Sequence, residues 1–251
     1  MIDGNYHSQP TSDRDVTHFV AQSAEHRLRT VRERIRQAEE EYGREPGSVR
    51  LLAVSKTHPL DALLELRAAG QVAFGESYVQ EAVEKIQAAD DPQIEWHFIG
   101  RVQSNKTREI AEHFAWVHSV CDGRHARRLN DQRPEELPPL NICIQVNVSG
   151  EASKGGSEPE AVGEILEYCR TLPRLRVRGL MAIPAQATQA EEKRAPFRLL
   201  RRLRDDLRES GMALDTLSMG MSADLEEAIA EGATLVRVGT ALFGPRHYAQ
   251  H

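Results

Sequence analysis

The chain has 251 residues, of which 40% are hydrophobic and 28% charged, a balance typical of a folded protein with one large α/β core. A formal net charge of −6 disfavours general binding to nucleic acid or to an anionic membrane, because a phosphate surface would repel the average face of the protein. The three cysteines lie far apart and form no CxxC pair, which indicates neither a disulfide framework nor a zinc knuckle and suits a cytoplasmic protein.

The N-terminal stretch, residues 1–14, is polar and lacks the apolar core of a signal peptide, so we expect a disordered tail there. From about residue 14 apolar side chains recur at three- and four-residue steps, which predicts an amphipathic helix. No apolar run approaches the length of a membrane-spanning helix. Because no linker rich in proline, glycine or serine divides the remainder, residues 15–251 are predicted to form one domain.

Short apolar runs then alternate regularly with amphipathic stretches. Eight of the runs are predicted strands, at 50–56, 71–76, 95–100, 115–120, 141–148, 177–183, 215–220 and 234–239. Two helices between them carry end signals: Ser157 and Glu160 have capping-box spacing, and Ser222 is a candidate N-cap of a helix that ends before Gly232. Eight strands, each followed by a helix, predict a single-domain (β/α)8 TIM barrel, with a doubly wound open sheet as the alternative.

The loops after the seventh and eighth predicted strands carry small and hydroxyl-bearing residues. In a (β/α)8 barrel the active site lies at the carboxyl ends of the strands, and these two loops often hold phosphate. Gly220 and Ser222 follow the seventh strand, and Gly239 and Thr240 follow the eighth. Each residue alone is more simply explained as a helix cap or a turn. Their occurrence in both loops predicts a phosphate site, because such turns let backbone N–H groups approach an anion.

Lys56 ends the first predicted strand and would therefore lie on the same rim as the phosphate site. A lysine at a strand end often extends its ammonium to water, but its amine could also form a Schiff base. Together with a phosphate site this predicts pyridoxal 5′-phosphate (PLP) as the cofactor, or a Schiff-base aldolase or lyase for a sugar phosphate. Arg237 faces the barrel interior by strand alternation. It could form an ion pair with Glu76 or Asp224, or donate to the pyridine nitrogen of PLP and weaken the ring as an electron sink.

Seven motifs in order carry a resemblance that covers about residues 25–248: LLAVSKTHP, FGESYVQEAVEKI, EWHFIGRVQSNK, QVNVSGEASKGG, VRGLMAIP, LSMGMSADLEEAI and LVRVGTALFGPR. By these motifs the chain resembles the pyridoxal-phosphate homeostasis proteins, the YggS/PROSC family, whose barrel is similar to the N-terminal domain of alanine racemase. The resemblance implies that the cofactor is PLP and that the cofactor lysine is Lys56.

The resemblance also implies the rest of the cofactor site. Phosphate would lie against Met221, Ser222, Gly239 and Thr240, while Arg237 would face the pyridine nitrogen. Ser218 and Met181 would line the pocket. The family usually has FGEN after the second strand, where this chain has FGES, so Ser77 would stand at the cofactor site in place of the asparagine, and the contact made by the asparagine amide is left open. No metal site is predicted, since the cluster of His113, His118 and His125 matches no common metal-binding spacing.

A carrier of PLP is favoured over an enzyme. A racemase needs a base on each face of the substrate, and in alanine racemases the second base is a tyrosine from a C-terminal domain that we do not expect in this chain. Tyr78 and His97 are the candidates to replace it, although both suit packing or loop structure equally. We expect a cytoplasmic monomer that acts in intracellular PLP (vitamin B6) and amino acid homeostasis, with PLP-dependent apo-enzymes as candidate acceptors. A PLP-dependent, racemase-like enzyme is the alternative.

Overall fold

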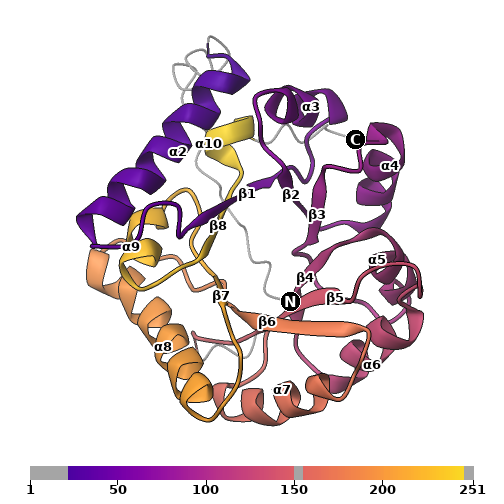
Figure 1. Cartoon of the computed structure of the whole chain (residues 1–251). Coiled ribbons are helices and arrows are strands. Elements are labelled where there is room, and N and C mark those ends of the chain that lie inside the picture. The colour runs from indigo at the N-terminus through magenta and orange to yellow at the C-terminus, as the bar shows by residue number, and fades with distance from the viewer. Residues whose placement is uncertain (1–21, 150–154, 246–251) are drawn as a thin grey trace, which may run out of the picture.

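The computed structural model of the protein describes residues 22–149 and 155–245, so the predicted tail, residues 1–14, lies outside the described residues. Eight parallel strands follow one another around a closed barrel in chain order (Figure 1). The strands are β1 (Arg50–Val54), β2 (Ala73–Glu76), β3 (Glu95–Phe98), β4 (Trp116–Val120), β5 (Leu140–Gln145), β6 (Leu175–Met181), β7 (Thr216–Ser218) and β8 (Leu235–Val238). Because β8 pairs with β1, the predicted (β/α)8 barrel is confirmed and the open doubly wound sheet is excluded.

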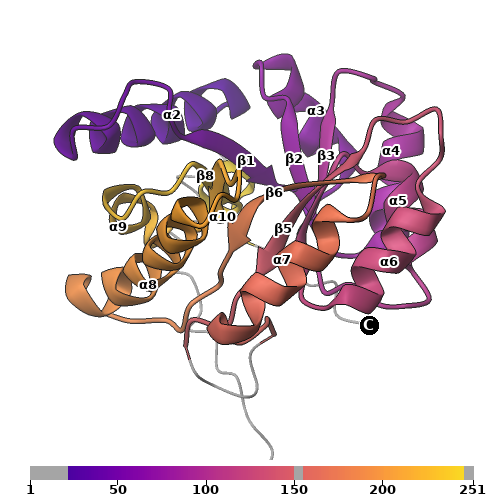
Figure 2. The ribbon, with the colours of Figure 1, turned by 60° about the horizontal axis from the view of Figure 1, so that its bottom comes forward.

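Helices alternate with the strands and surround the barrel, as two views of the ribbon show (Figure 1 and Figure 2). They are α2 (Ala24–Glu41), α3 (Leu60–Ala68), α4 (Val79–Ala89), α5 (Thr107–His113), α6 (Gly123–Gln132), the 3-10 turn η1 (Pro159–Ala161), α7 (Val162–Arg170), α8 (Ala190–Glu209), α9 (Leu225–Ala230) and α10 (Thr240–Phe243). Apolar side chains between helices and strands form one large buried cluster, and its burial holds the two layers together. Within the described ranges no helix is both long enough and apolar enough to cross a lipid bilayer.

The amphipathic helix predicted near the N-terminus is α2, which packs on the outside of the barrel against α3, α9 and α10. It begins at Ala24 because Ser23 is extended and its hydroxyl accepts a hydrogen bond from the N–H of His26 at 3.2 Å. Residues 14–21 of the predicted helix lie outside the described residues. The buried face carries Leu28, Val31, Ile35 and Ala38, which recur at the three- and four-residue steps on which the prediction was based.

Two predicted helix caps are wrong, and one predicted helix end is confirmed. The Ser157 hydroxyl donates to the carbonyl of Cys121 at 2.6 Å, and it caps no helix because the chain there enters η1 first. Ser222 is not the N-cap of α9, which begins after Asp224. The carboxylate of Asp224 instead accepts the N–H of Met221 at 2.6 Å. Gly232 follows α9 with φ of +92°, as predicted for a residue just past a helix end.

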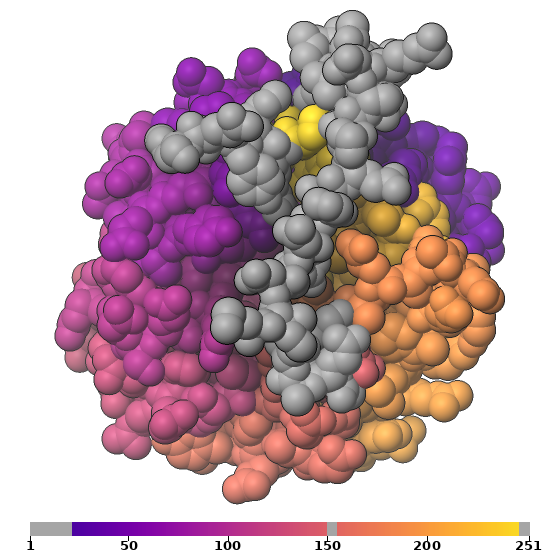
Figure 3. Space-filling model, turned by 180° about the vertical axis from the view of Figure 1, so that it is seen from behind, coloured from indigo at the N-terminus to yellow at the C-terminus, as the bar shows by residue number. Residues whose placement is uncertain are grey.

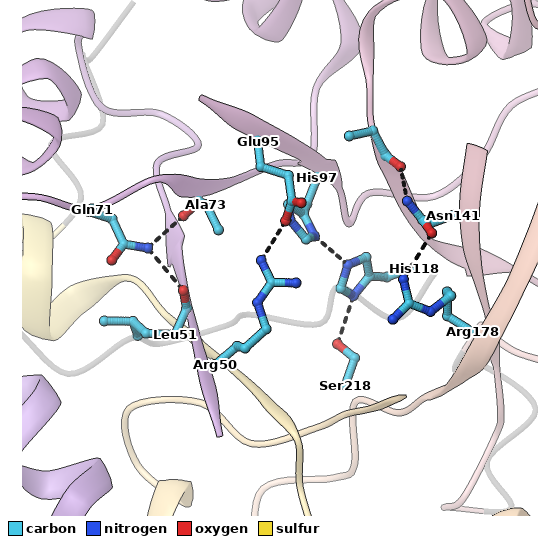
Figure 4. A network of polar contacts seen from close by, with 11 residues as sticks. Arg50, Leu51, Gln71, Ala73, Glu95, His97, His118, Asn141, Arg178 and Ser218 are labelled. Carbon is cyan, nitrogen blue, oxygen red and sulfur yellow. Dashed lines mark hydrogen bonds and ion pairs between the residues drawn. The ribbon is translucent and has the colours of Figure 1, made fainter. Parts of the chain in front are cut away.

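The interior of the barrel is only partly apolar. Two small buried clusters are separate from the large one, the first formed by Leu52, Ala73 and Leu235 and the second by Trp116, Cys143 and Met181. Polar side chains of several strands, His97 and His118 among them, meet in the remaining interior (Figure 4). Because side chains fill the barrel, its interior is a packed core and not a pore. Ligands of such barrels bind at one end, where the strands end.

Candidate functional site

A cavity of about 330 Å³ opens at the carboxyl ends of the strands. Figure 3 shows the molecule from behind the view of Figure 1, with orange residues of the C-terminal half on the right and purple and magenta residues of the N-terminal half on the left. Its lining comes from the ends of β1, β3, β6, β7 and β8, namely Val54, Lys56, His58, Ile99, Ile183, Gln186, Met221, Ser222, Ala223, Arg237, Gly239 and Thr240. This end of the fold is where barrel enzymes bind their ligands, and small-molecule sites span about 300–1,000 Å³. A larger hollow of about 830 Å³ lies outside the barrel between α6 and α7 and contains none of the predicted site residues.

The lining of the cavity is positively charged although the protein as a whole is acidic. Lys56 and Arg237 contribute two cationic side chains, and no aspartate or glutamate is found among the lining residues that the structure describes. Over the full sequence, by contrast, the formal net charge is −6. Because a cleft focuses the field of the charges that line it, an anionic ligand is favoured here over the surrounding surface.

Lys56 lies in a tight turn directly after β1, where its side chain is half-buried. The next residue, Thr57, has φ of +65°, a left-handed conformation that is strained for a β-branched residue. Its N–H donates to Glu81 Oε1 at 2.6 Å, which helps to hold the turn in this shape. The ring of His58 stacks on Phe243 of α10, with the ring centroids 4.9 Å apart. The turn that presents Lys56 is therefore fixed by contacts with α4 and α10.

A buried ionic cluster supports the start of the same turn. Lys85 Nζ donates to the carbonyl of Ser55 at 2.9 Å, to Glu76 Oε1 at 2.8 Å and to Glu81 Oε1 at 2.6 Å. The Ser55 hydroxyl also donates to Glu76 Oε1, at 2.7 Å. Burial raises the pKa of Glu76, and the cation of Lys85 opposes that rise. The residue before Lys56 is thus bonded through its hydroxyl and its carbonyl to side chains of β2 and α4.

The turns after β7 and β8 adjoin each other in the wall of the cavity. Gly220 has φ of +90°, and a Cβ at this position would lie 2.5 Å from the Cβ of Ala228, so the turn requires glycine. The Gly220 carbonyl accepts the N–H of Arg237 at 2.9 Å, which joins this turn to β8. After β8, Gly239 passes close to β1, since a Cβ there would lie 3.3 Å from the carbonyl oxygen of Val54. The two turns predicted to hold an anion are therefore brought together.

Arg237 projects from β8 into the barrel, is only 3% exposed and reaches the cavity. Its Nη1 donates to the carbonyl oxygen of Ser218 at 2.6 Å and to Ser218 Oγ at 2.8 Å, and its Nη2 donates to the carbonyl of Ala182 at 2.9 Å. Of the two alternatives for Arg237, the ion pair with Glu76 or Asp224 is wrong, because the guanidinium bonds neutral oxygens. Burial lowers the pKa of Arg237 to about 10, so the group stays charged at neutral pH. A buried cation that forms no ion pair with any described residue is unfavourable unless a ligand compensates it.

The cavity lining includes six of the nine residues predicted to bind the cofactor: Lys56, Met221, Ser222, Arg237, Gly239 and Thr240. The other three do not belong to the lining. Ser218 is buried beside Arg237, and Met181 packs against Trp116 inside the barrel. Ser77 follows β2, where its backbone lies so close to Gly100 that a Cβ on the glycine would be 2.1 Å from the Ser77 carbonyl oxygen.

Six further lining residues were not predicted: Val54, His58, Ile99, Ile183, Gln186 and Ala223. His58 could have been predicted as a lining residue, because it follows Lys56 by two residues in the same motif. Ile183 and Gln186 lie in the loop after β6, whose path no local sequence pattern determines. The two residues considered as a second base are not in the lining: Tyr78 is 56% exposed before α4, and His97 is fully buried inside the barrel.

Comparisons with known proteins agree with this geometry. A family model described as the alanine racemase N-terminal domain matches residues 26–247. A pyridoxal phosphate homeostasis protein of Pseudomonas aeruginosa is 57% identical over 218 residues, which cover 87% of this chain and 94% of that protein. The chain belongs to the pyridoxal phosphate homeostasis protein family. The resemblance inferred from the seven motifs is therefore confirmed.

Solved structures of PipY from Synechococcus elongatus have the same fold as this family member. PipY without PLP is 40% identical with a TM-score of 0.79, and the match covers 89% of this chain and all of that one. PipY with PLP bound is 39% identical with a TM-score of 0.77 and covers 88% of this chain and all of that one. At this identity the comparison confirms the barrel.

Proposed function

We propose that the chain binds PLP in this cavity, holds it as a Schiff base through Lys56, and acts in intracellular PLP (vitamin B6) and amino acid homeostasis. One observation carries the proposal: a single small cavity unites a lysine, a buried arginine and two glycine-containing turns, and none of its described lining residues is acidic. PLP presents an aldehyde, a pyridine nitrogen and a phosphate, and the cavity offers a group suited to each. The name of the relative and the PLP-bound structure of PipY support the same function.

The residues of the cavity fit the two polar ends of PLP. The glycine turns leave room for a phosphate beside the hydroxyls of Ser222 and Thr240 and the backbone N–H groups that follow them. Arg237 uses three of its five N–H groups on Ser218 and Ala182, which leaves two for a ligand acceptor such as the pyridine nitrogen. Because a guanidinium keeps its proton, that nitrogen would accept a hydrogen bond without becoming protonated.

Lys56 would make the link reversible. Its amine condenses with the aldehyde, the oxygen leaves as one water, and water or a second amine can displace the lysine again. Since Lys56 is half-buried at the cavity rather than enclosed in the core, an incoming amine can approach it. A reversible link suits a protein that stores an aldehyde and releases it.

We propose a carrier rather than an enzyme, acting as a cytoplasmic monomer with PLP-dependent apo-enzymes as acceptors. Tyr78 and His97, which could have completed a racemase site, lie outside the cavity lining. The relatives are named for homeostasis, which supports the same choice. Exchange of the α-proton of alanine for deuterium, catalysed by the PLP-loaded protein in deuterated water, would instead favour the racemase-like alternative.

Absorbance spectroscopy tests the proposed binding. The protein incubated with PLP and freed of excess ligand is expected to show a Schiff-base band that Lys56→Ala lacks. Lys106→Ala is the matched control, because Lys106, directly before α5, pairs with Glu109 and lies outside the cavity lining. A protein that gains no band, or an identical band in Lys56→Ala, would refute the proposal.

A further inference from the structure

A continuous line of hydrogen bonds crosses the barrel interior from the amino end of the strands to the cavity. We call it the interior chain, and its members in order are Arg50, Glu95, His97, His118, Ser218 and Arg237. Figure 4 shows the first five side chains pointing toward one another from β1, β3, β4 and β7. The sixth, Arg237, lines the candidate site.

Each link of the interior chain is short. Arg50 Nη2 and His97 Nε2 each lie 2.6 Å from Glu95 Oε1. His97 Nδ1 lies 2.8 Å from His118 Nε2, and His118 Nδ1 lies 2.7 Å from Ser218 Oγ. None of these side chains has a buried nitrogen or oxygen without a partner in the described part of the chain. A network satisfied to this degree holds its members in one arrangement.

The chemistry of the two ends fixes the direction of every link. Burial alone would raise the pKa of Glu95, but the bonds and charges of His97 and Arg50 together lower it to about 2, so the carboxylate only accepts. His97 Nε2 must then donate to Glu95. Burial lowers the pKa of both His97 and His118, which favours neutral rings that each carry one hydrogen.

The remaining links follow from the first. With its hydrogen on Nε2, His97 accepts at Nδ1, so His118 donates from Nε2 and accepts at its own Nδ1. The Ser218 hydroxyl must therefore donate to His118. The lone pairs of Ser218 Oγ then face Arg237 Nη1, 2.8 Å away, which is a donor in every protonation state it adopts. In each hydrogen bond of the series from Arg237 to Glu95, the donor is therefore the group nearer the cavity.

We propose that His97 and His118 are positioning residues of the cofactor site, which keep Ser218 an acceptor and thereby hold the guanidinium of Arg237 at the cavity. This inference depends on the proposed function in one respect, that PLP is the ligand that Arg237 contacts. The need to fill the barrel does not explain the interior chain, because apolar side chains could fill the same space without burying charged groups. A line that ends on a carboxylate also makes Ser218 Oγ a stronger acceptor, since linked hydrogen bonds polarise one another.

The ring tautomers test the direction of the chain without any ligand. Two-bond ¹H–¹⁵N spectra of the unmodified protein at pH 7 are expected to show both His97 and His118 neutral, with the hydrogen on Nε2. Variants that lack one histidine each assign the signals. A hydrogen on Nδ1 of either neutral ring, or a doubly protonated ring, would overturn the inference, because Ser218 would then no longer be forced to donate to His118.

A matched pair of variants tests the positioning of Arg237. His118→Leu removes both hydrogen bonds of the ring, whereas His118→Gln keeps one donor and one acceptor on a side chain of similar size. We expect PLP to bind about tenfold more weakly to His118→Leu and to Ser218→Ala, with a shifted absorption band, and within about threefold of normal to His118→Gln. His113→Asn is the control, because His113 lies on α5 outside the interior chain and its Nδ1 bonds the Glu109 carbonyl of its own helix.

The outcomes separate this inference from the proposed function. Normal PLP affinity and an unshifted band in both His118→Leu and Ser218→Ala would overturn the positioning role while leaving PLP binding intact. If the unmodified protein bound no PLP, the proposed function would fail. Hydrogen exchange of the Arg237 Nη groups with water, followed by NMR, would then decide the inference: about tenfold faster exchange in His118→Leu supports it, and an unchanged rate overturns it.

Discussion

Replacing Lys85 with methionine is expected to expose the full penalty of the buried carboxylate of Glu76. Lys85 Nζ lies 2.8 Å from Glu76 Oε1, and the Glu76 side chain is fully buried while that of Lys85 is 8% exposed. Methionine nearly matches lysine in length but carries no charge. The variant therefore removes the cation that compensates Glu76 without emptying the space that the side chain fills.

The size of the effect depends on pH in a defined direction. Removing one partner of a buried ion pair destabilises a protein by about 3–5 kcal/mol. Burial already raises the pKa of Glu76, and without Lys85 that pKa rises further, so the carboxyl group can avoid the penalty by binding a proton. An acid with a higher pKa in the folded than in the unfolded state loses stability as pH rises between the two values. The Lys85→Met protein should therefore lose less stability at pH 5 than at pH 8.

Urea unfolding at both pH values measures this difference. In the double variant Lys85→Met, Glu76→Gln neither charge of this buried pair remains, so it should regain part of the lost stability and lose the added pH dependence. Lys106→Met is the control, because the Lys106–Glu109 pair is more exposed and such pairs contribute about 0–1 kcal/mol. Equal losses at pH 5 and pH 8, or a double variant no more stable than Lys85→Met, would refute the reasoning.

Two further predictions concern packing around the barrel. Gly220→Ala should destabilise the protein by about 3 kcal/mol or more, against about 1–2 kcal/mol for Gly211→Ala. Both glycines have positive φ, but of the two only Gly220 has a neighbour with which a Cβ would clash. Equal melting temperatures of the two variants would contradict this. Burial raises the pKa of the Cys143 and Cys169 thiols to about 12, so a thiol reagent at pH 8 should modify only the half-buried Cys121 in the folded protein and three thiols after unfolding. Rapid labelling of Cys143 in the folded protein would show that the barrel interior is more open than described.

The strand order and the rim turns were predictable because their signals are local. Alternating apolar runs mark each strand, and the glycines after the seventh and eighth runs mark the turns. The ends of the strands were less predictable: the run at 141–148 was predicted whole, but β5 ends at Gln145. The N–H of Val146 still donates to the Met181 carbonyl of β6, but Val146 also forms an isolated bridge with Ser157, and the N–H of Asn147 donates to the Ser157 carbonyl. No local pattern shows that the strand changes partner at this point.

The partners of the interior residues could not be predicted from spacing. His97, His118 and Ser218 come from β3, β4 and β7, and only the register of the closed barrel brings their side chains into line. The same register explains why Arg237 bonds Ser218 and Ala182 and forms no ion pair with Glu76 or Asp224. Alternation along one strand shows which side chains point inward, but the residues they meet depend on strands far away in the sequence.

The central claim is that the amine of Lys56 holds PLP. Reduction of the PLP-loaded protein with borohydride makes that bond permanent, and mass spectrometry of the digested protein then locates it. We predict that the cofactor mass is found on the peptide containing Lys56 and disappears in Lys56→Ala. Attachment to another lysine alone, or no attachment after reduction, would contradict the account.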